Sequence, residues 1–489
     1  MSERVRAQVL VIGSGAGGAV TALELAARGF DVTVIEEGPR TSLAAYGQPP
    51  PAALRELYRD RGMTPLLGPV PIGFVEGCCV GGSTEINSGF WHRTRRETLA
   101  RWKAAFDLDG ASPAEMEPHF EWAETQLGVS LYGGEWPPST QVFARGIEAM
   151  GWSAHEVSRA APGCAGTNAC AHGCPTGAKQ GMSVSLLPQA EAHGARILPE
   201  CRALLLLRRR GRIAGVLASR KRPDGRRELV RLDAEAVFVC GGATQSPALL
   251  RRSGIKLHVG NTLNVHPMLK ATALFDQPLD SQRSVLPLLQ VKEFWPEISI
   301  GGAFFTPGHL AMALSENWPE NHELMRQVRH MASYYVAVTG TGYGMVRPAR
   351  FGGAGTVLRY RLTRWERRNL SLGLARMAML LLAAGARAVY PAGQGLPPIR
   401  TETEAARWLD ELLPPSALSL TTVHAFSSCP AGERPERCAV DSYGAVFGYQ
   451  NLRVNDASIL PDSTGVNPQG SIMAMARRNV LHFAEMAGR

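Results

Sequence analysis

Long apolar runs are missing from this chain of 489 residues. The most apolar helical stretch, between Arg376 and Arg387, has about half of the roughly 20 residues that a helix needs to cross a bilayer. Residues Met1–Arg6 carry no secretory, twin-arginine or lipidation motif and lead directly into an apolar run. We therefore expect no transmembrane segment and a cytoplasmic location.

Cysteine is also sparse, and charge of one sign is not concentrated. Nine cysteines, an odd number with uneven spacing, do not form the framework of a secreted disulfide-rich protein. Charged residues make up 19% and hydrophobic residues 45%, which argues against intrinsic disorder. The net charge of +9 comes mostly from scattered arginines. Their densest cluster, Arg208–Arg212, has no aromatic pattern for nucleic-acid binding, so we expect a solvated hairpin tip.

Glycine, in contrast, is plentiful, with 52 residues gathered in short motifs. Residues 8–12 form an apolar run typical of a buried parallel strand and lead into Gly13-Ser14-Gly15-Ala16-Gly17-Gly18. An amphipathic helix over residues 19–28 and a strand over residues 31–35 follow, and the strand stops at Glu36. This order predicts a βαβ unit.

The βαβ unit has the chemistry of a dinucleotide site. Gly13, Gly15 and Gly18 permit a tight turn and the close approach of a pyrophosphate to the helix N-terminus. Glu36 can accept hydrogen bonds from a ribose hydroxyl, and it repels a 2′-phosphate, which disfavours NADP. The unit alone leaves NAD and FAD equally open.

The remaining chain alternates between helical and strand-like segments. Residues 95–150 are predicted to be largely helical, and a helix is expected near residues 370–384. Short strands are predicted at residues 195–198, 203–207, 213–218 and 236–240. These separated blocks indicate a nucleotide domain built from several chain segments, with a second domain inserted between them.

Three further motifs carry a family resemblance. Residues 242–250, continuing to Ser253-Gly254-Ile255, resemble the second signature of the glucose–methanol–choline (GMC) oxidoreductases, with Lys256 in place of the usual final glycine. Residues 259–267 are similar to the segment that follows this signature. Residues 451–458 and 465–468 resemble the C-terminal block of the family. With the βαβ unit, the resemblance covers both ends and the middle of the chain.

The resemblance implies an α/β fold with two domains. A Rossmann-like FAD-binding domain would be built from the discontinuous segments 1–92, 176–266 and 425–489. An α+β substrate domain with an antiparallel sheet would comprise residues 93–175 and 267–424.

The resemblance also implies FAD as the cofactor, and it decides between FAD and NAD. Ile86 stands where some members tether the flavin through histidine, so we expect non-covalent binding. Asn87 and Asp456 have an alternative role as structural caps of turns. The residues implied in FAD binding are Gly13, Gly15, Gly18, Glu36, Gly81, Gly82, Ser83, Asn87, Ala203, Asp456 and Pro468.

His424 and Asn467 match the catalytic pair of the family, which implies oxidation of an alcohol to a carbonyl. His424 would take the hydroxyl proton as general base, while hydride passes from carbon to flavin N5. An imidazole with a pKa near 6.5 suits this step, and the Asn467 amide can hold the alcohol oxygen. We expect structural roles for His266 and His92. A flavin-binding protein without turnover is the alternative from another class.

Cys164, Cys170 and Cys174 form a tight group in a loop rich in glycine and proline. A comparable spacing in a dehydrogenase branch of the family holds an iron–sulfur cluster, which would pass electrons to a partner. A zinc site that includes His172 and a group of buried thiols are the other interpretations. The acceptor, O2 or a redox partner, stays open. Lys179-Gln180-Gly181 and residues 383–386 are similar to the long-chain alcohol oxidase branch, which favours a bulky or apolar alcohol.

Overall fold

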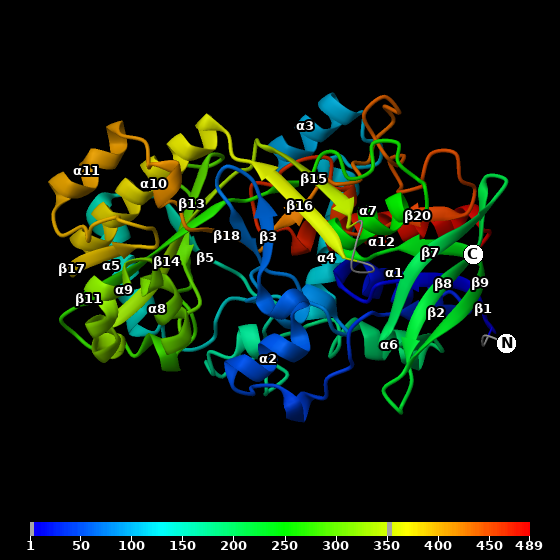
Figure 1. Ribbon diagram of the computed structural model, residues 1–489, viewed down its shortest axis with the longest axis horizontal. Coiled ribbons are helices and arrows are strands. Elements are labelled where there is room, and N and C mark those ends of the chain that lie inside the picture. Colours follow the sequence, from blue (N-terminus) through cyan, green and yellow to red (C-terminus); the bar gives the residue numbers. More distant parts are fainter. Residues whose placement is uncertain (1–3, 350–354) are drawn as a thin grey trace.

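The computed structural model describes residues 4–349 and 355–489 (Figure 1). Two sheets organise the molecule, one at each end of the long axis, and both termini lie beside the smaller sheet. No helix in the described part of the chain combines the length and apolar character needed to cross a membrane.

The smaller sheet contains the predicted βαβ unit. Its strand order is β6-β2-β1-β9-β8-β7, and β20 pairs with β9. The pairs between β1, β2, β6, β9 and β20 are parallel. Because helices cover both faces, Val9, Leu10 and Val11 of β1 are fully buried. The strands are β1 (Arg4–Ile12), β2 (Val32–Ile35), β6 (Arg196–Leu198), β7 (Cys201–Arg209), β8 (Arg212–Lys221), β9 (Arg227–Val239) and β20 (Leu452–Val454).

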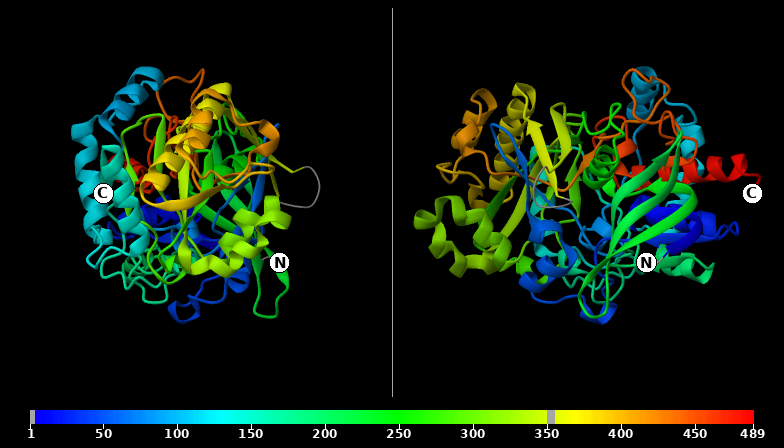
Figure 2. Two further views of the ribbon diagram at one scale, coloured as in Figure 1. Left: turned by 90° about the vertical axis from the view of Figure 1, so that its left-hand side faces the viewer. Right: turned by 45° about the vertical axis from the view of Figure 1, so that its right-hand side comes forward.

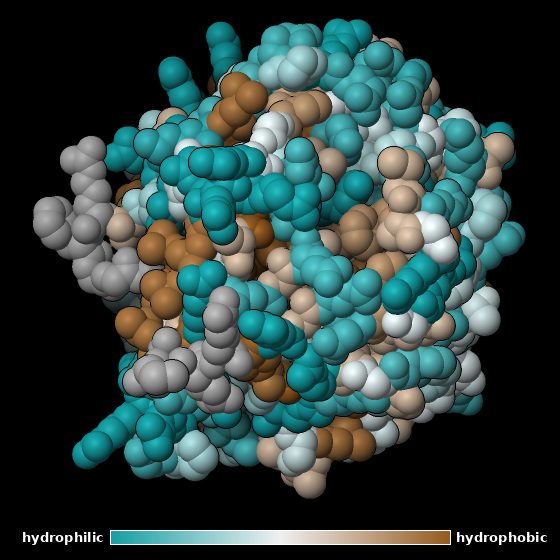
Figure 3. Space-filling model, turned by 90° about the vertical axis from the view of Figure 1, so that its right-hand side faces the viewer, coloured by the Kyte–Doolittle hydropathy of each residue, from teal (hydrophilic) through white to brown (hydrophobic). Residues whose placement is uncertain are grey.

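The arginine cluster lies where the sequence predicts a hairpin tip. Strands β7 and β8 pair antiparallel, and Arg210 and Gly211 turn between them with φ of 45° and 72°. This end of the molecule presents a mostly hydrophilic surface with smaller hydrophobic areas between the polar side chains (Figure 3).

Helices cover the smaller sheet and connect it to the larger one. The predicted helical region is confirmed, and α3, α4 and α5 follow one flank of the molecule (Figure 2). Helix α4 packs against α12, whereas α5 packs against α10. Capping boxes at Ser112 and Thr363 start α4 and α10. The helices are α1 (Ala16–Ala26), α2 (Pro50–Leu57), α3 (Arg96–Phe106), α4 (Pro113–Leu127), α5 (Pro138–Met150), α6 (Leu186–Ala192), α7 (Gly242–Arg252), α8 (Pro307–Leu314), α9 (Trp318–Asn321), α10 (Arg364–Ala383), α11 (Glu402–Asp410) and α12 (Gln469–Met486).

The larger sheet has the order β15-β16-β3-β4-β18-β11-β14-β13-β12-β5, with β17 on β11. Its pairs are antiparallel except β16 with β3 and β18 with β4. A separate short pair joins β10 to β19. The strands are β3 (Thr64–Leu67), β4 (Ile72–Phe74), β5 (Ala154–Glu156), β10 (Asn264–Val265), β11 (Met268–Phe275), β12 (Leu289–Val291), β13 (Ile298–Gly302), β14 (Met331–Val338), β15 (Tyr343–Pro348), β16 (Thr356–Arg361), β17 (Ala386–Pro391), β18 (Leu420–Thr422) and β19 (Ala425–Phe426).

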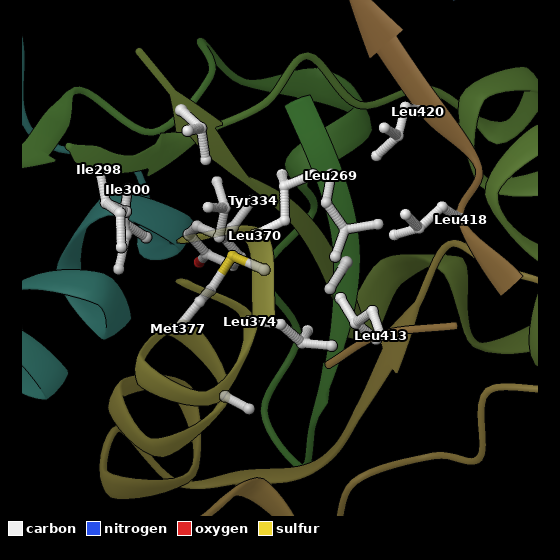
Figure 4. Close-up of a cluster of buried hydrophobic side chains, with 14 of the residues drawn as sticks. Leu269, Ile298, Ile300, Tyr334, Leu370, Leu374, Met377, Leu413, Leu418 and Leu420 are labelled. Carbon is white, nitrogen blue, oxygen red and sulfur yellow. The ribbon is translucent and has the colours of Figure 1, made fainter. Parts of the chain in front are cut away.

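One face of the larger sheet is a hydrophobic core. Leu269, Ile298 and Ile300 meet Leu374 and Met377 of α10 (Figure 4). Because successive side chains of a strand point to opposite faces, the alternate residues of β11, β13 and β14 face away from α10. The second face is thereby left to form a wall of the site.

The α/β fold with two sheets confirms the predicted fold class. Strands β3 and β4 lie within residues 1–92, the first segment of the predicted FAD-binding domain, yet they pair in the larger sheet. Strand pairing therefore crosses the predicted boundary at this point, because main-chain pairing with distant strands leaves no trace in the local sequence pattern.

Candidate active site

A cavity of about 430 Å³ lies between the smaller sheet and the polar face of the larger sheet. Its lining brings together chain segments that are far apart in sequence. Of the predicted site residues, the structure places in this lining Gly13, Gly15, Glu36, Gly82, Ser83, Asn87, Ala203, Asp456, Pro468, His424 and Asn467.

Gly18 and Gly81 do not line the cavity, and each has a packing role. A Cβ atom at Gly18 would lie 2.0 Å from the carbonyl oxygen of Gly13, so glycine allows α1 to pack on the preceding loop. Gly81 has φ of +96°, and its amide donates to Ser14 Oγ at 3.0 Å. Both glycines therefore support the conformation of the cavity wall without lining the cavity themselves.

Glu36 is buried at the end of β2 and ties the Gly-rich loop to the next turn. Its Oε2 atom accepts hydrogen bonds from Ser14 N at 3.0 Å and Ser14 Oγ at 2.7 Å, while Oε1 accepts from Gly38 N at 2.9 Å. Burial raises the pKa of Glu36, and the three hydrogen bonds oppose that rise. An Oε1 lone pair remains for a ligand hydroxyl.

Asp456 and Asn87 line the cavity while they also hold turns. Asp456 accepts hydrogen bonds from the amides of Gly242 and Ser458, both at 2.8 Å, and from the hydroxyls of Ser246 and Ser458. Asn87 donates to Gln469 Oε1 at 2.6 Å and accepts from Gly89 N at 3.1 Å. The capping role that the sequence left open is therefore present.

The cavity fits an extended dinucleotide. Gly15 is the N-cap of α1 and has no atom within 4 Å of an ideal Cβ position, so a ligand can approach its backbone closely. A Cβ atom at Gly82 would lie 3.0 Å from Gly15 Cα, which brings the two glycine loops together at one point. Side chains in this part of the wall would narrow the space.

His424 and Asn467 meet at the cavity wall. Strands β10 and β19 pair with Val265 opposite Ala425, and this register puts His266 beside His424. The Asn467 Nδ2 atom donates to His424 Nε2 at 3.2 Å, and the Nδ1 atoms of His424 and His266 are 3.0 Å apart. His266 Nε2 lies 2.9 Å from Ser463 Oγ.

One arrangement of protons satisfies this chain of contacts. Since the Asn467 amide donates to Nε2 of His424, a neutral His424 carries its proton on Nδ1 and donates it to His266 Nδ1. His266 then carries its proton on Nε2 and donates to Ser463 Oγ. The lone pair of His424 Nε2 is consequently directed to the side of Asn467, where both residues line the cavity.

Burial lowers the pKa of His424 to about 4, below the ordinary value that the sequence suggested. Burial also lowers the pKa of His266, with a contribution from Lys292. Both rings are therefore neutral near pH 7. The expected structural role of His266 needs revision, because the residue contacts the predicted base directly.

The three clustered cysteines lie outside the cavity lining and are free thiols. The buried Arg159 guanidinium is 3.5 Å from Cys164 Sγ and 3.4 Å from Cys170 Sγ. Cys174 Sγ accepts from Lys179 N at 3.5 Å, and hydrogen bonds of this kind lower its pKa although burial raises it. In the part of the chain that the structure describes, no three His, Cys, Asp or Glu side chains are placed to hold a metal ion. The iron–sulfur and zinc interpretations therefore lack support.

Family models for GMC oxidoreductases match residues 9–268 and 353–476. The chain belongs to the GMC oxidoreductase family. An uncharacterized GMC-type oxidoreductase of Sinorhizobium fredii is 40% identical over 97% of this chain and 94% of its own length. A long-chain-alcohol oxidase of Arabidopsis thaliana is 26% identical over 97% of this chain and 66% of its own length.

Solved structures of very different sequence share the fold. Pyridoxine 4-oxidase from Mesorbium loti superposes with a TM-score of 0.75 at 17% identity, over 98% of this chain and 99% of its own. A variant of formate oxidase from Aspergillus oryzae gives 0.73 at 14%, over 99% of each chain. The family and the fold predicted from the motifs are therefore confirmed, and the chain is an oxidoreductase by family.

Sequence reasoning missed the functional interest of three residues that line the cavities next to His424, namely His266, Lys270 and Lys292. His266 stands in the family segment 259–267, so its motif marked it, but its partner became clear only from the β10–β19 register. Lys270 and Lys292 carried no motif at all. Both line cavities that also contain His424 and Asn467.

Proposed function

We propose that this GMC oxidoreductase binds FAD without a covalent link and oxidises an alcohol to a carbonyl. The observation that carries the proposal is the meeting of His424 Nε2 and Asn467 Nδ2, 3.2 Å apart, on the wall of the cavity that the glycine motifs enclose. Family membership supports FAD, and so does the fit of the glycine-lined cavity to an extended dinucleotide.

The cofactor-binding residues surround one part of the cavity. Gly13, Gly15 and Gly82 would receive the pyrophosphate and flavin side of FAD, and Glu36 Oε1 would accept a ribose hydroxyl. Bound FAD would supply the acceptor for the hydride that leaves the alcohol carbon.

The catalytic pair would divide the work on the hydroxyl group. The Asn467 amide donates a hydrogen bond to the alcohol oxygen, and the neutral His424 accepts its proton at Nε2. His266 acts as a positioning residue, because it accepts the Nδ1 proton of His424 and so keeps Nε2 unprotonated. The similarity of the chain to a long-chain-alcohol oxidase supports a substrate with an apolar body.

Anaerobic mixing with a panel of alcohols tests this function. Purified protein that carries FAD should lose its oxidised flavin absorbance with at least one sugar, sterol, fatty or aromatic alcohol. Absence of bleaching across the whole panel would favour a flavin-binding protein without turnover. Repeating the active mixture with O2 and with an artificial acceptor then separates an oxidase from a dehydrogenase.

A further inference from the structure

Two lysines lie on the polar face of the larger sheet, on the wall beside the catalytic pair. Lys270 of β11 pairs with Tyr335 of β14. Lys292 follows β12, and its Nζ atom is 3.3 Å from Ser299 Oγ of β13. Alternation along the strands points Lys270, Tyr335 and Ser299 to the same side, away from α10.

The two lysines flank His424 and Asn467. Lys270 lines the large cavity, and Lys292 lines a second small cavity of about 20 Å³. Three residues, Tyr335, His424 and Asn467, contribute to both cavities. Both lysines therefore line cavities that also border His424 and Asn467, and the large cavity beside Lys270 has room for a substrate.

Neither lysine has a counter-charge among the residues that the structure describes. Within residues 4–349 and 355–489, no hydrogen bond or ion pair engages Lys270 Nζ, and no carboxylate influences either ammonium group. The charged group that influences the pKa of Lys292 is another cation, Arg95, which lowers it. Burial accordingly lowers the pKa of Lys270, and it lowers that of Lys292 to about 7.

Lys179, in contrast, is a buried lysine whose ammonium group is fully hydrogen-bonded within the protein. Lys179 Nζ donates to the carbonyl oxygens of Glu85, Asn87 and Cys170, at 2.5, 3.0 and 2.9 Å. These three acceptors use the full donor capacity of an ammonium group. Lys270, which is half-buried, has no such acceptor among the described residues, and partial burial of an unpaired charge is unfavourable.

The acidic residues of the large cavity cannot serve as partners, because each is already engaged elsewhere. Glu37 pairs with Arg59 and Arg202, and Glu76 pairs with Arg59. Glu36 and Asp456 accept the hydrogen bonds described above. The lining of the large cavity also contains the apolar side chains of Phe90, Leu286 and Phe304, and His309 lies close enough to Lys270 for the ammonium charge to lower its pKa.

We infer that the substrate is an alcohol with an apolar body and an anionic group, a carboxylate or a phosphate, which binds at Lys270 or at Lys292. The inference rests on the proposed function and names its substrate class. The bound anion supplies the missing counter-charge on the sheet face, and the hydroxyl group meets His424 and Asn467.

Matched pairs of alcohols test this inference in protein that carries FAD. 6-Hydroxyhexanoate and 6-hydroxyhexyl phosphate are compared with 1,6-hexanediol by anaerobic flavin reduction. The anionic alcohols should reach half-saturation at a concentration at least about tenfold lower, and the two anions show which group the site prefers. Equal half-saturation for charged and neutral alcohols would overturn the inference, while flavin reduction by the diol would leave the proposed function intact.

Lysine variants locate the effect. Lys270→Met and Lys292→Met should raise the half-saturation concentration of the preferred anion by roughly 30-fold or more at one or both sites, because each removes the positive charge of a half-buried charge pair. The value for 1,6-hexanediol should change less than about threefold. Lys270→Arg keeps the charge, and Lys103→Met removes an exposed lysine that pairs with Asp107 and Asp109 as a control. An unchanged preference in both Met variants would refute the assignment.

A binding measurement separates this inference from turnover. Hexanoate, which lacks a hydroxyl group, should bind the FAD-loaded protein in calorimetry, and its affinity should fall in the Met variant that weakens the anionic alcohol, even where no alcohol reduces the flavin. If neither Met variant weakens hexanoate binding and Lys270→Met changes only the flavin reduction potential, Lys270 serves the cofactor and the inference fails. FAD content and thermal unfolding verify folding, and Lys270→Gln replaces Lys270→Met if the latter does not fold.

Discussion

The charged side chains on the proposed cofactor side of the cavity have partners within the chain, whereas those on the proposed substrate side do not have a counter-charge among the described residues. Glu36, Asp456 and Glu37 are each satisfied by amides, hydroxyls or arginines of the chain itself. On the larger sheet, Lys270 Nζ has no such partner in the part of the chain that the structure describes, and Lys292 Nζ contacts the hydroxyl of Ser299. This difference favours a tightly bound cofactor on the first side and, on the second side, a substrate that supplies the counter-charge when it binds.

The same contrast holds for rigidity around the two ligands. The glycine loops are fixed by Ser14, which bonds Glu36 and Gly81 at once. His424, in contrast, is fixed on one ring nitrogen by His266, while its other nitrogen meets a residue of the cavity wall. Variants on the two sides should therefore separate cofactor affinity from the rate of alcohol oxidation.

The largest effect is expected on the substrate side. His424→Ala removes the proposed general base and should slow flavin reduction by roughly 10²–10⁴-fold, with FAD still bound. Stopped-flow absorbance at saturating alcohol measures the rate, and the flavin-to-protein ratio is the control. A variant that reduces its flavin at the original rate would exclude His424 from the mechanism.

The matching change on the cofactor side should leave chemistry intact and weaken FAD. Glu36→Ala strands the donors of Ser14 and Gly38 and removes a ribose acceptor, so the dissociation constant of FAD should rise roughly 10- to 100-fold. Fluorescence titration of the apoprotein gives this constant. Glu36→Gln retains one acceptor oxygen and should show a smaller loss; an FAD affinity unchanged in both would break the comparison.

Asn467→Ala should have a smaller effect on the same step as His424→Ala. Loss of one hydrogen bond to the alcohol oxygen is expected to slow flavin reduction about tenfold. Asn467→Asp, which keeps the shape but not the donor, serves as the comparison. If Asn467→Ala slows the reaction as much as His424→Ala, the assignment of base and positioning group is wrong.

The pH dependence of flavin reduction should report how far burial lowers the pKa of His424. Because burial lowers the pKa of His424 to about 4, the imidazole keeps its free lone pair at higher pH and loses it on protonation below that value. The rate of flavin reduction at saturating 1,6-hexanediol should stay level between pH 5 and 8 and halve near pH 4. A midpoint near 6.5 would show that His424 is solvated in the working enzyme.

The smallest effect is expected at the cysteine group, outside both walls. Cys170→Ser should change flavin reduction and electron transfer to an artificial acceptor less than about twofold, since the thiol contacts Arg159 and lines no part of the cavity. Iron analysis of anaerobically purified protein accompanies the rates. Iron bound in the original protein and lost from the variant would restore the cluster interpretation.

Elements with strong local patterns could be predicted from the amino-acid sequence. The apolar strand, the glycine turn and the acid at Glu36 predicted the βαβ unit, because a buried parallel strand and a tight turn each demand particular residues at particular places. The order of the family motifs placed His424 and Asn467 in the same site. The hairpin tip at Arg208–Arg212 followed from a basic turn between two apolar runs.

Contacts between residues far apart in sequence became clear from the fold alone. His266 and His424 are 158 residues apart and meet because β10 and β19 pair in one register. Packing also lowers the pKa of His424 and leaves Lys270 Nζ without a hydrogen-bond partner among the described residues. It likewise keeps the described cysteine sulfurs out of an arrangement that could hold a metal ion. Local sequence sets what a side chain can do, whereas burial and partners from distant strands set what it does.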